Sequence, residues 1–268
     1  MASFKRSRYR TRQFGIGLVG TLLILVGVVL GLRTPPHLYS SGILISVGCS
    51  ILAAVVVSLM SPLNEKAYEN FMSLGISSVY PSRRDVEPRK WVQWLRSAKH
   101  SCVLVGIAHG NWCRDPDFEG ALTERLHNNV DVKIFFLKPD GPAAGVRAKE
   151  DKGRDTIHQI RTSIGVVWNI RKTLAPELAS RLKLFVYEAT PSMGVTWIDE
   201  FMVATHYLAG SENVTSPALL LEPSRFDSEH EGLYAIYARN VQIIEKEFSE
   251  PVTEENIGNY ALPGACEN

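Results

Sequence analysis

The sequence has few cysteines, almost no net charge and no internal repeat or low-complexity segment. Cys49, Cys102, Cys113 and Cys266 are widely spaced and form no CxxC pair, which argues against a zinc site or a disulfide framework. Because 29 Lys and Arg face 28 Asp and Glu, no overall field attracts nucleic acid or acidic substrates. We therefore expect reduced thiols in a cytosolic domain, without a metal, a cofactor or a nucleic-acid partner.

Two long runs near the N-terminus, residues 14–32 and 41–60, contain no charged side chain. At about 1.5 Å per residue, each is long enough as a helix to cross a hydrocarbon core of about 30 Å. The eight residues between them, "RTPPHLYS", form a short connection. The pattern predicts a two-span transmembrane α-hairpin over residues 14–60. Since neither run contains an ionisable residue, an ion or proton pathway through one hairpin is poorly supported.

The flanking charges predict the orientation of this hairpin. Residues 1–13 form a basic tail, whereas the connection between the spans has only Arg33 at its edge. Positive segments stay on the cytoplasmic side, so both termini should face the cytoplasm. We expect an integral protein of a prokaryotic inner or plasma membrane, in contact with membrane lipid. The basic residues of the tail are Lys5, Arg6, Arg8, Arg10 and Arg12.

Small residues recur at every fourth position of the second run, at Gly42, Ser46, Ser50, Ala54 and Ser58. Such a stripe lets helix backbones approach closely in lipid. It fits either packing of the hairpin on itself or self-association between chains.

The remainder of the chain predicts a cytosolic α/β domain with a mixed sheet. Residues 61–90 suggest a juxtamembrane helix that ends near Gly75, followed by a polar linker, "ISSVYPSRRDVEP". The main domain is expected over residues 91–248, after the start of an amphipathic helix at 89–100. Residues 249–268 form a C-terminal tail, expected to be loosely ordered after Pro251.

Within this domain, "SCVLVGIAH" and "DVKIFFLKPDG" are typical of buried strands, and the segment between them is typical of a helix. This order predicts a parallel pair with a right-handed crossover. Further strands are expected at 181–190 and 217–222, with a hairpin between them that turns at Asp199 and Glu200. A closing helix over 228–250 should face the core through Leu233, Ile236, Tyr237, Val241 and Ile244.

Ligands of open α/β sheets bind beyond the carboxyl ends of the parallel strands. The loops at those ends are "HGNWCRD" (109–115) and "KPDG" (138–141). Trp112 in the first loop could stack on a base or act as a packing lid. The two arginines in "PSRRD" carry planar guanidinium groups that suit phosphate. The same groups could instead contact anionic headgroups or solvent. The candidate ligand-binding residues are His109, Asn111, Arg114, Asp115, Lys138, Asp140, Arg83 and Arg84.

The order of elements over residues 75–248 resembles one half of the phospholipase D superfamily. The quoted segments are "SAKHS" before the strand "CVLVGIA", then "NNVDVKIFFLKPD", a long insert, and a terminal hairpin. Each catalytic half of that family carries H-x-K-x4-D on the first strand of the hairpin, with G-S-x-N near the end of the second. The family site is built from two halves, so the resemblance implies a homodimer.

The family's catalytic residues are missing from both possible alignments of this hairpin. With Asp199 at the Asp position, the His position falls on Ser192 and the Lys position on Gly194. Starting from His206 instead places Leu208 and Asn213 at the Lys and Asp positions. "GSEN" at 210–213 stands too far after Asp199 for the usual spacing.

We therefore expect a degenerate, non-catalytic module that binds a phosphate-bearing ligand, a nucleotide or a lipid headgroup, in signalling or defence. One competing hypothesis is a phosphodiesterase with a rearranged site that uses His109 or His206, with Asp199 as a further weak catalytic candidate. Another is a structural protein of membrane assemblies. His206 itself lies in an apolar run, which favours a partly buried, hydrogen-bonded side chain.

Overall fold

The computed structural model describes residues 19, 21–26, 28–29, 46–53, 71–150, 155–207, 215–223 and 231–262. The chain divides into two units, Met1–Asn70 and Phe71–Asn268. Most of the predicted spans, 14–32 and 41–60, lies outside the described residues. In the part of the chain that is described, no helix is long and apolar enough to cross a membrane. The transmembrane hairpin and its orientation therefore stay predictions.

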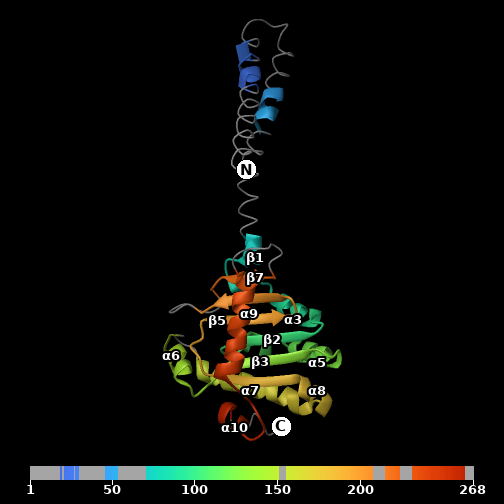
Figure 1. Cartoon of the computed structure of the whole chain (residues 1–268), viewed down its shortest axis with the longest axis vertical. Coiled ribbons are helices and arrows are strands. Elements are labelled where there is room, and N and C mark those ends of the chain that lie inside the picture. Colours follow the sequence, from blue (N-terminus) through green and yellow to red (C-terminus); the bar gives the residue numbers. More distant parts are fainter. Residues whose placement is uncertain are drawn as a thin grey trace. The chain divides into compact units, whose positions relative to one another are not determined.

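A mixed sheet of eight strands organises the second unit (Figure 1), in the order β1-β7-β6-β5-β2-β3-β4-β8. Its centre is parallel and consists of β2 (Ser101–Gly106), β3 (Asp131–Leu137) and β4 (Leu182–Tyr187). The helix α5 (Phe118–His127) connects β2 to β3. These elements confirm the mixed α/β fold and the predicted strand–helix–strand unit.

Antiparallel strands extend the sheet on both sides of this centre. β5 (Met193–Ile198) pairs with β2 and forms a hairpin with β6 (Phe201–His206), which confirms the predicted turn. Beyond β6 lie β7 (Ala218–Leu221) and the edge strand β1 (Ile76–Tyr80). The opposite edge is β8 (Ser249–Pro251), paired with β4.

The helices differ in length and in their place along the chain. Between β1 and β3 are the 3-10 helix η2 (Arg83–Asp85), α3 (Pro88–Ser97), the short α4 (Gly110–Cys113) and α5. Between β3 and β4 are α6 (Pro142–Glu150), α7 (Thr156–Thr173) and α8 (Pro176–Arg181). After β7 follow α9 (Leu233–Ile243), the π-helical turn η3 (Ile244–Phe248) and α10 (Ile257–Tyr260).

The two faces of the sheet are covered differently. On one face, Cys102 and Leu104 of β2 are almost fully buried. On the other face, α9 runs across the strands (Figure 1). Trp197 of β5 donates its indole N–H to the Tyr234 hydroxyl of α9 at 3.0 Å, which ties this helix to the sheet. The core therefore consists of the sheet and the helices packed on both its faces.

The predicted polar linker at 76–88 is wrong, because this segment is part of the domain. Ile76–Tyr80 alternates between half-buried and exposed residues, as expected of an edge strand, and pairs with β7. The helix that precedes it ends as predicted, with Gly75 in the left-handed region at φ 76°. Its predicted start at residue 64 lies outside the described residues.

The expectation of a loosely ordered tail after Pro251 is also wrong for residues up to 262. Val252, Ile257 and Tyr260 are buried, and the Tyr260 hydroxyl donates to Glu250 at 2.8 Å. The Glu250 carboxylate also pairs with Lys138 at 3.1 Å. These contacts fix the tail beside the end of β3.

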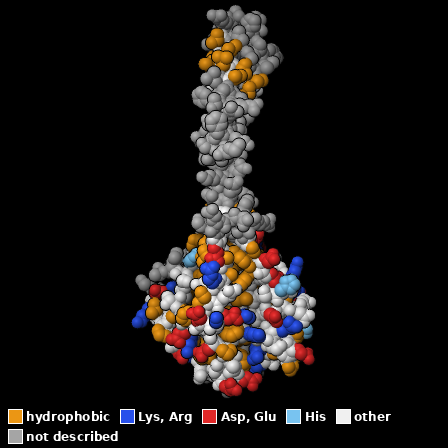
Figure 2. All heavy atoms as spheres, in the orientation of Figure 1, with side chains coloured by type: hydrophobic (Ala, Val, Ile, Leu, Met, Phe, Trp, Pro, Cys, Tyr) orange, Lys and Arg blue, Asp and Glu red, His pale blue; other side chains and the backbone are white. Residues whose placement is uncertain are grey.

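The closing helix is shorter than predicted. α9 covers only Leu233–Ile243 and changes to a π-helical turn at Ile244. Val241 is buried, but Ile236 is 45% exposed, so its predicted core position is wrong. On the face that Figure 2 shows, acidic and basic side chains are interspersed. That distribution agrees with the near-zero net charge of the sequence.

Candidate functional site

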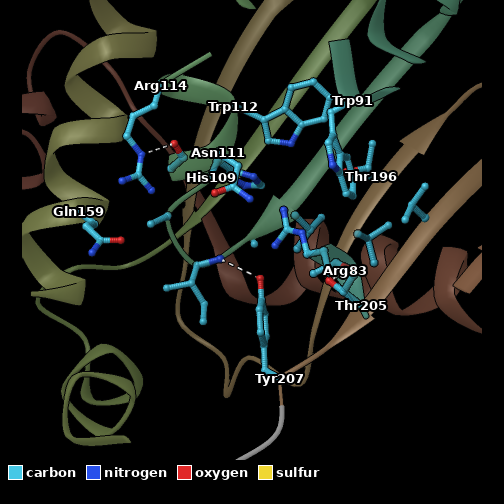
Figure 3. Close-up of a pocket in the computed structure, with 18 of the residues that line it drawn as sticks. Arg83, Trp91, His109, Asn111, Trp112, Arg114, Gln159, Thr196, Thr205 and Tyr207 are labelled. Carbon is cyan, nitrogen blue, oxygen red and sulfur yellow. Dashed lines mark hydrogen bonds between the residues drawn. The ribbon is translucent and has the colours of Figure 1, made fainter. Parts of the chain in front are cut away.

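A small cavity of about 80 Å³ lies at the carboxyl end of β2, where β5 and β6 run beside it. The loop after β2, the turn η2 and the helix α7 complete its walls (Figure 3). This position agrees with the expectation that ligands bind beyond the ends of parallel strands. The polar residues that line it are Arg83, His109, Asn111, Arg114, Thr156, Gln159, Thr196, Thr205 and Tyr207.

Arg83 enters the cavity from η2 because the backbone on both sides of it is fixed. Ser82 caps this turn through the backbone N–H of Arg84 at 3.2 Å, and its own N–H donates to Asp85 at 2.9 Å. The backbone N–H of Arg83 donates to the Ser216 carbonyl at 2.8 Å. The Arg83 guanidinium then lies over the Trp91 ring, 5.0 Å from its centroid, which orients the fork.

The Arg83 guanidinium is incompletely satisfied. Its Nε atom is buried and has no hydrogen-bond partner among the described residues. Burial lowers the pKa of this guanidinium, because removal from water disfavours the charged form. A buried donor without an acceptor costs about 1–3 kcal/mol, so an anion in the cavity would relieve this cost.

His109, in the loop after β2, has an unusual backbone conformation. Its φ is 51°, in the left-handed region, which turns the chain sharply into α4. The ring lies edge-on to Phe136, and Nε2 is 3.0 Å from the Phe135 carbonyl oxygen. Since a carbonyl oxygen only accepts, Nε2 carries the proton in this arrangement.

The surroundings of His109 keep its imidazole neutral. Burial is the largest cause, and the positive charge of Arg83 adds to it, so the pKa falls to about 4 despite the bond to Phe135. At neutral pH the ring therefore contributes a fixed polar edge and no charge.

Tyr207 occupies the space that two glycines leave open. The backbone N–H of Ile107 donates to its hydroxyl at 3.3 Å. A Cβ atom on Gly194 would lie 2.7 Å from this hydroxyl oxygen, and one on Gly106 would lie 3.1 Å from it. Glycine in a strand interior marks such close approaches. Gly194 thus has a packing role.

A larger hollow of about 520 Å³ adjoins the small cavity. The two share Arg83, Trp91, Asn111, Trp112 and Arg114 in their walls. We call them the inner cavity and the outer hollow. Trp112 is almost fully buried and packs edge-on against Trp91, so it forms a wall and serves as packing. The residues that line only the outer hollow are Arg84, Val86, Pro88, Asp115 and Pro116.

The structure brings together most of the predicted ligand-binding residues, but not all. His109, Asn111, Arg114 and Arg83 line the inner cavity. Arg84 and Asp115 line the outer hollow only, and Lys138 and Asp140 line neither.

Lys138 lies at the same end of the sheet but turns toward the opposite edge strand. It contacts Glu188 at 3.5 Å and Glu250 at 3.1 Å. The hydrogen bond to Glu250 is the main reason that the pKa of Lys138 is raised. The charge of Lys138 is therefore paired with carboxylates that fix the tail.

Asp199 lies at the opposite end of β2 from the inner cavity and stabilises the backbone there. Its carboxylate accepts the backbone N–H groups of Lys99 (2.7 Å), His100 (2.9 Å) and Ser101 (2.9 Å). Partial burial opposes ionisation, but these three donors outweigh it and lower the pKa of Asp199. At about 3.3 Å per residue, the five steps from Ser101 to Gly106 separate this carboxylate from the inner cavity by roughly 16 Å.

The other catalytic candidates are also outside the inner cavity. His206 is held by the Tyr237 hydroxyl at 2.6 Å, the hydrogen-bonded position expected from its apolar run. Ser192, at the family's nucleophile position, is exposed. "GSEN" at 210–213 lies outside the described residues. Within the part of the chain that the structure describes, no group of three or more His, Cys, Asp or Glu residues could hold a metal ion.

The charged groups that line the inner cavity are positive among the residues that the structure describes. Two guanidiniums line it, from Arg83 and Arg114, and no described Asp or Glu does. Arg114 is partly committed, because its Nε donates to the Gly110 carbonyl at 2.8 Å. Hydroxyl and amide groups supply further donors.

Sequence reasoning missed the walls that β5, β6 and α7 contribute. Thr196, Thr205, Tyr207 and Gln159 all line the inner cavity. The available signal was the pair of strand glycines, Gly106 and Gly194, which indicate that another group comes close to the backbone.

Comparison with known proteins gives only distant likenesses. No protein-family model and no curated protein sequence matches the chain. Among solved structures it is similar to TrmBL2, an archaeal chromatin protein with a novel mode of DNA binding. The identity is 15% and the TM-score 0.40, over 76% of this chain and 70% of that one.

It is also similar to phosphatidylserine synthase from Haemophilus influenzae, a phospholipase-D-like protein. That likeness has 9% identity and a TM-score of 0.40, over 65% of this chain and 39% of the synthase. The chain thus matches about two fifths of that enzyme's length. Identities this low do not carry a function from one protein to another.

Proposed function

We propose that the chain is a membrane-anchored, non-catalytic module whose second unit binds an anionic, phosphate-bearing ligand. The observation that carries this proposal is the Arg83 guanidinium, which lies in the inner cavity with a buried Nε that has no hydrogen-bond partner among the described residues. A guanidinium presents its donors in a planar fork that matches the oxygens of phosphate.

The electrostatics of the inner cavity support the same ligand class. Arg83 and Arg114 supply positive charge, and no carboxylate from the described part of the chain lines the cavity to neutralise it. Charge-assisted hydrogen bonds to phosphate are stronger than neutral ones, particularly in partly buried sites. The neutral His109 adds polarity without a charge that changes at physiological pH.

Binding is favoured over catalysis because the catalytic candidates lie apart. His109 and Asp199 are at opposite ends of β2, and His206 is hydrogen-bonded to Tyr237. A nucleophile, its base and a charge clamp need to be within hydrogen-bonding reach of one another. Their separation supports binding over a rearranged phosphodiesterase that combines these residues.

The membrane anchor in this proposal rests on the two uncharged runs at 14–32 and 41–60. A short connection to a cytosolic binding domain would suit a role in signalling or defence. Self-association, through the small-residue stripe or paired domains, is part of the same proposal.

A thermal-shift screen of the full chain tests ligand binding. The protein is purified in a sugar-headgroup detergent, which adds no phosphate, and is heated with chloride, sulfate or phosphate. At a hundred times its dissociation constant, a ligand adds about 2.7 kcal/mol to stability. We expect a phosphate-specific shift that Arg83→Met reduces by half or more and Arg89→Met keeps, since Arg89 lines neither the inner cavity nor the outer hollow. Absence of any anion-dependent shift would favour a purely structural membrane protein.

A further inference from the structure

The inner cavity alone is too small for most organic ligands. Its volume of about 80 Å³ has room for roughly five to eight water-sized atoms. A phosphate group, with one phosphorus and four oxygens, is of this size, whereas a sugar or a base is not. A ligand bound at Arg83 can therefore place only its phosphoryl end there.

The outer hollow supplies the missing space. Its volume of about 520 Å³ is within the range of about 300–1,000 Å³ that is usual for small-molecule sites. It shares Arg83 and Arg114 with the inner cavity, so both guanidiniums border both compartments. Figure 3 shows the Arg83 side chain beside Thr205, with its guanidinium toward Trp91 and His109.

The chemistry of the two compartments is different. Among the described residues, Trp91 and Trp112 line both compartments, whereas the aromatic side chains of His109 and Tyr207 line only the inner cavity. The outer hollow adds the apolar side chains of Val86, Pro88 and Pro116 and places only two further charged side chains, Arg84 and Asp115, at its lining. Such a surface suits an organic group with an apolar face and a few polar substituents.

The charge of the inner cavity selects between kinds of phosphate ester. Of the residues described, two arginines and no Asp or Glu line it. A phosphomonoester carries about −1.5 to −2 at neutral pH, which neutralises both charges, whereas a diester carries only one negative charge. A monoester also has a free phosphoryl end that fits a compartment of this size.

We infer that the ligand is a phosphomonoester of an organic group about the size of a nucleoside. Its phosphoryl group occupies the inner cavity against Arg83 and Arg114, and its organic group occupies the outer hollow beside Trp91 and Pro88. This inference rests on the proposed phosphate-binding function and specifies the class of ligand.

Calorimetric titration of the full chain in the same detergent tests this inference. The probes are inorganic phosphate, glycerol 3-phosphate, adenosine 5′-monophosphate and adenosine. We expect adenosine 5′-monophosphate to bind at least tenfold more tightly than inorganic phosphate, and adenosine at least a hundredfold more weakly than its monophosphate. Arg84→Gln should weaken the nucleotide at least fivefold and inorganic phosphate less than twofold, because Arg84 lines only the outer hollow.

The outcomes separate this inference from the function on which it rests. If inorganic phosphate binds as tightly as the nucleotide, the inference is wrong and phosphate binding stands. If glycerol 3-phosphate equals the nucleotide, an ester the size of a lipid headgroup suffices and the nucleoside-sized group is wrong. If adenosine binds as tightly as its monophosphate, the phosphoryl group does not occupy the inner cavity. If no phosphate compound binds, both proposals fail.

Discussion

Replacement of Arg83 by methionine should leave the ligand-free protein as stable as before, or make it more stable. Arginines that reach into a domain usually contribute to its stability through their hydrogen bonds. The Nε atom of Arg83 has no such bond among the described residues, and burial disfavours its charge. Residues kept for binding often reduce the stability of the free protein.

The magnitude follows from the contacts of this side chain. The substitution removes a cation–π contact with Trp91 at 5.0 Å, worth about 0.5–2 kcal/mol. A methionine in its place keeps a contact with the ring worth about 0.3–1.5 kcal/mol. Removal of the buried, unpaired donor adds about 1–3 kcal/mol to the free energy of unfolding. With the middle value of each range, the net change should be an increase of about 1–2 kcal/mol in the free energy of unfolding.

Arg171 provides a matched control. It also lies over a tryptophan, 5.0 Å from the Trp168 centroid, but its Nε donates to the carbonyls of Ala179 and Leu182 at 3.3 and 3.2 Å. Arg171→Met should lower the free energy of unfolding by about 1–3 kcal/mol, because it leaves two acceptors without their donor.

Urea denaturation of the ligand-free full chain measures both variants against the wild type. With a slope of about 3 kcal/mol/M, a gain of 2 kcal/mol raises the midpoint by roughly 0.7 M. The reasoning would be refuted if Arg83→Met destabilised the protein as much as Arg171→Met does. Arg83 would then be a structural residue.

Three further predictions concern neighbouring residues. Because His109 has a folded pKa of about 4 and an ordinary value of 6.5, protonation favours unfolding, and about 3 kcal/mol of stability should be lost as pH falls from 6.5 to 4. His109→Asn, which tolerates the positive φ, should flatten that part of a pH series of urea midpoints. Asp199→Ala should lower the free energy of unfolding by about 2–4 kcal/mol in the same assay, because three backbone donors lose their acceptor. The dissociation constant for phosphate should stay within twofold, since these donors lie roughly 16 Å from the cavity, and a large change in affinity would contradict this. Gly194→Ala should cost about 1–3 kcal/mol, because its Cβ would lie 2.7 Å from the Tyr207 hydroxyl oxygen, and addition of Tyr207→Phe should restore part of the loss.

The centre of the fold could be predicted because its signals are local. β2 and β3 are continuous apolar runs since both of their faces are buried, and a helix-forming segment separates them. The hairpin turn could be placed because Asp199 tolerates the left-handed region, where its φ is 49°. The apolar neighbours of His206 likewise predicted that its side chain would be hydrogen-bonded.

The edges of the fold depend on contacts far apart in the sequence. Ile76–Tyr80 contains two serines and becomes a strand only by pairing with Ala218–Leu221. That pairing and the bond to Ser216 bring Arg83 into the cavity, which no local pattern could predict. Likewise, Lys138 lies outside the predicted site because the pairing of β8 with β4 brings Glu250 next to it.

The central claim is that Arg83 binds a phosphate-bearing anion in the inner cavity. Calorimetric titration of inorganic phosphate into the ligand-free full chain, with Arg83→Met and Arg89→Met alongside, tests it most directly. A lost charge-assisted hydrogen bond of about 1.5–3 kcal/mol corresponds to weaker binding by roughly 10- to 150-fold. We predict saturable binding that Arg83→Met weakens by that factor and Arg89→Met leaves within twofold. Equal affinities in all three proteins, or no binding by the wild type, would contradict the claim.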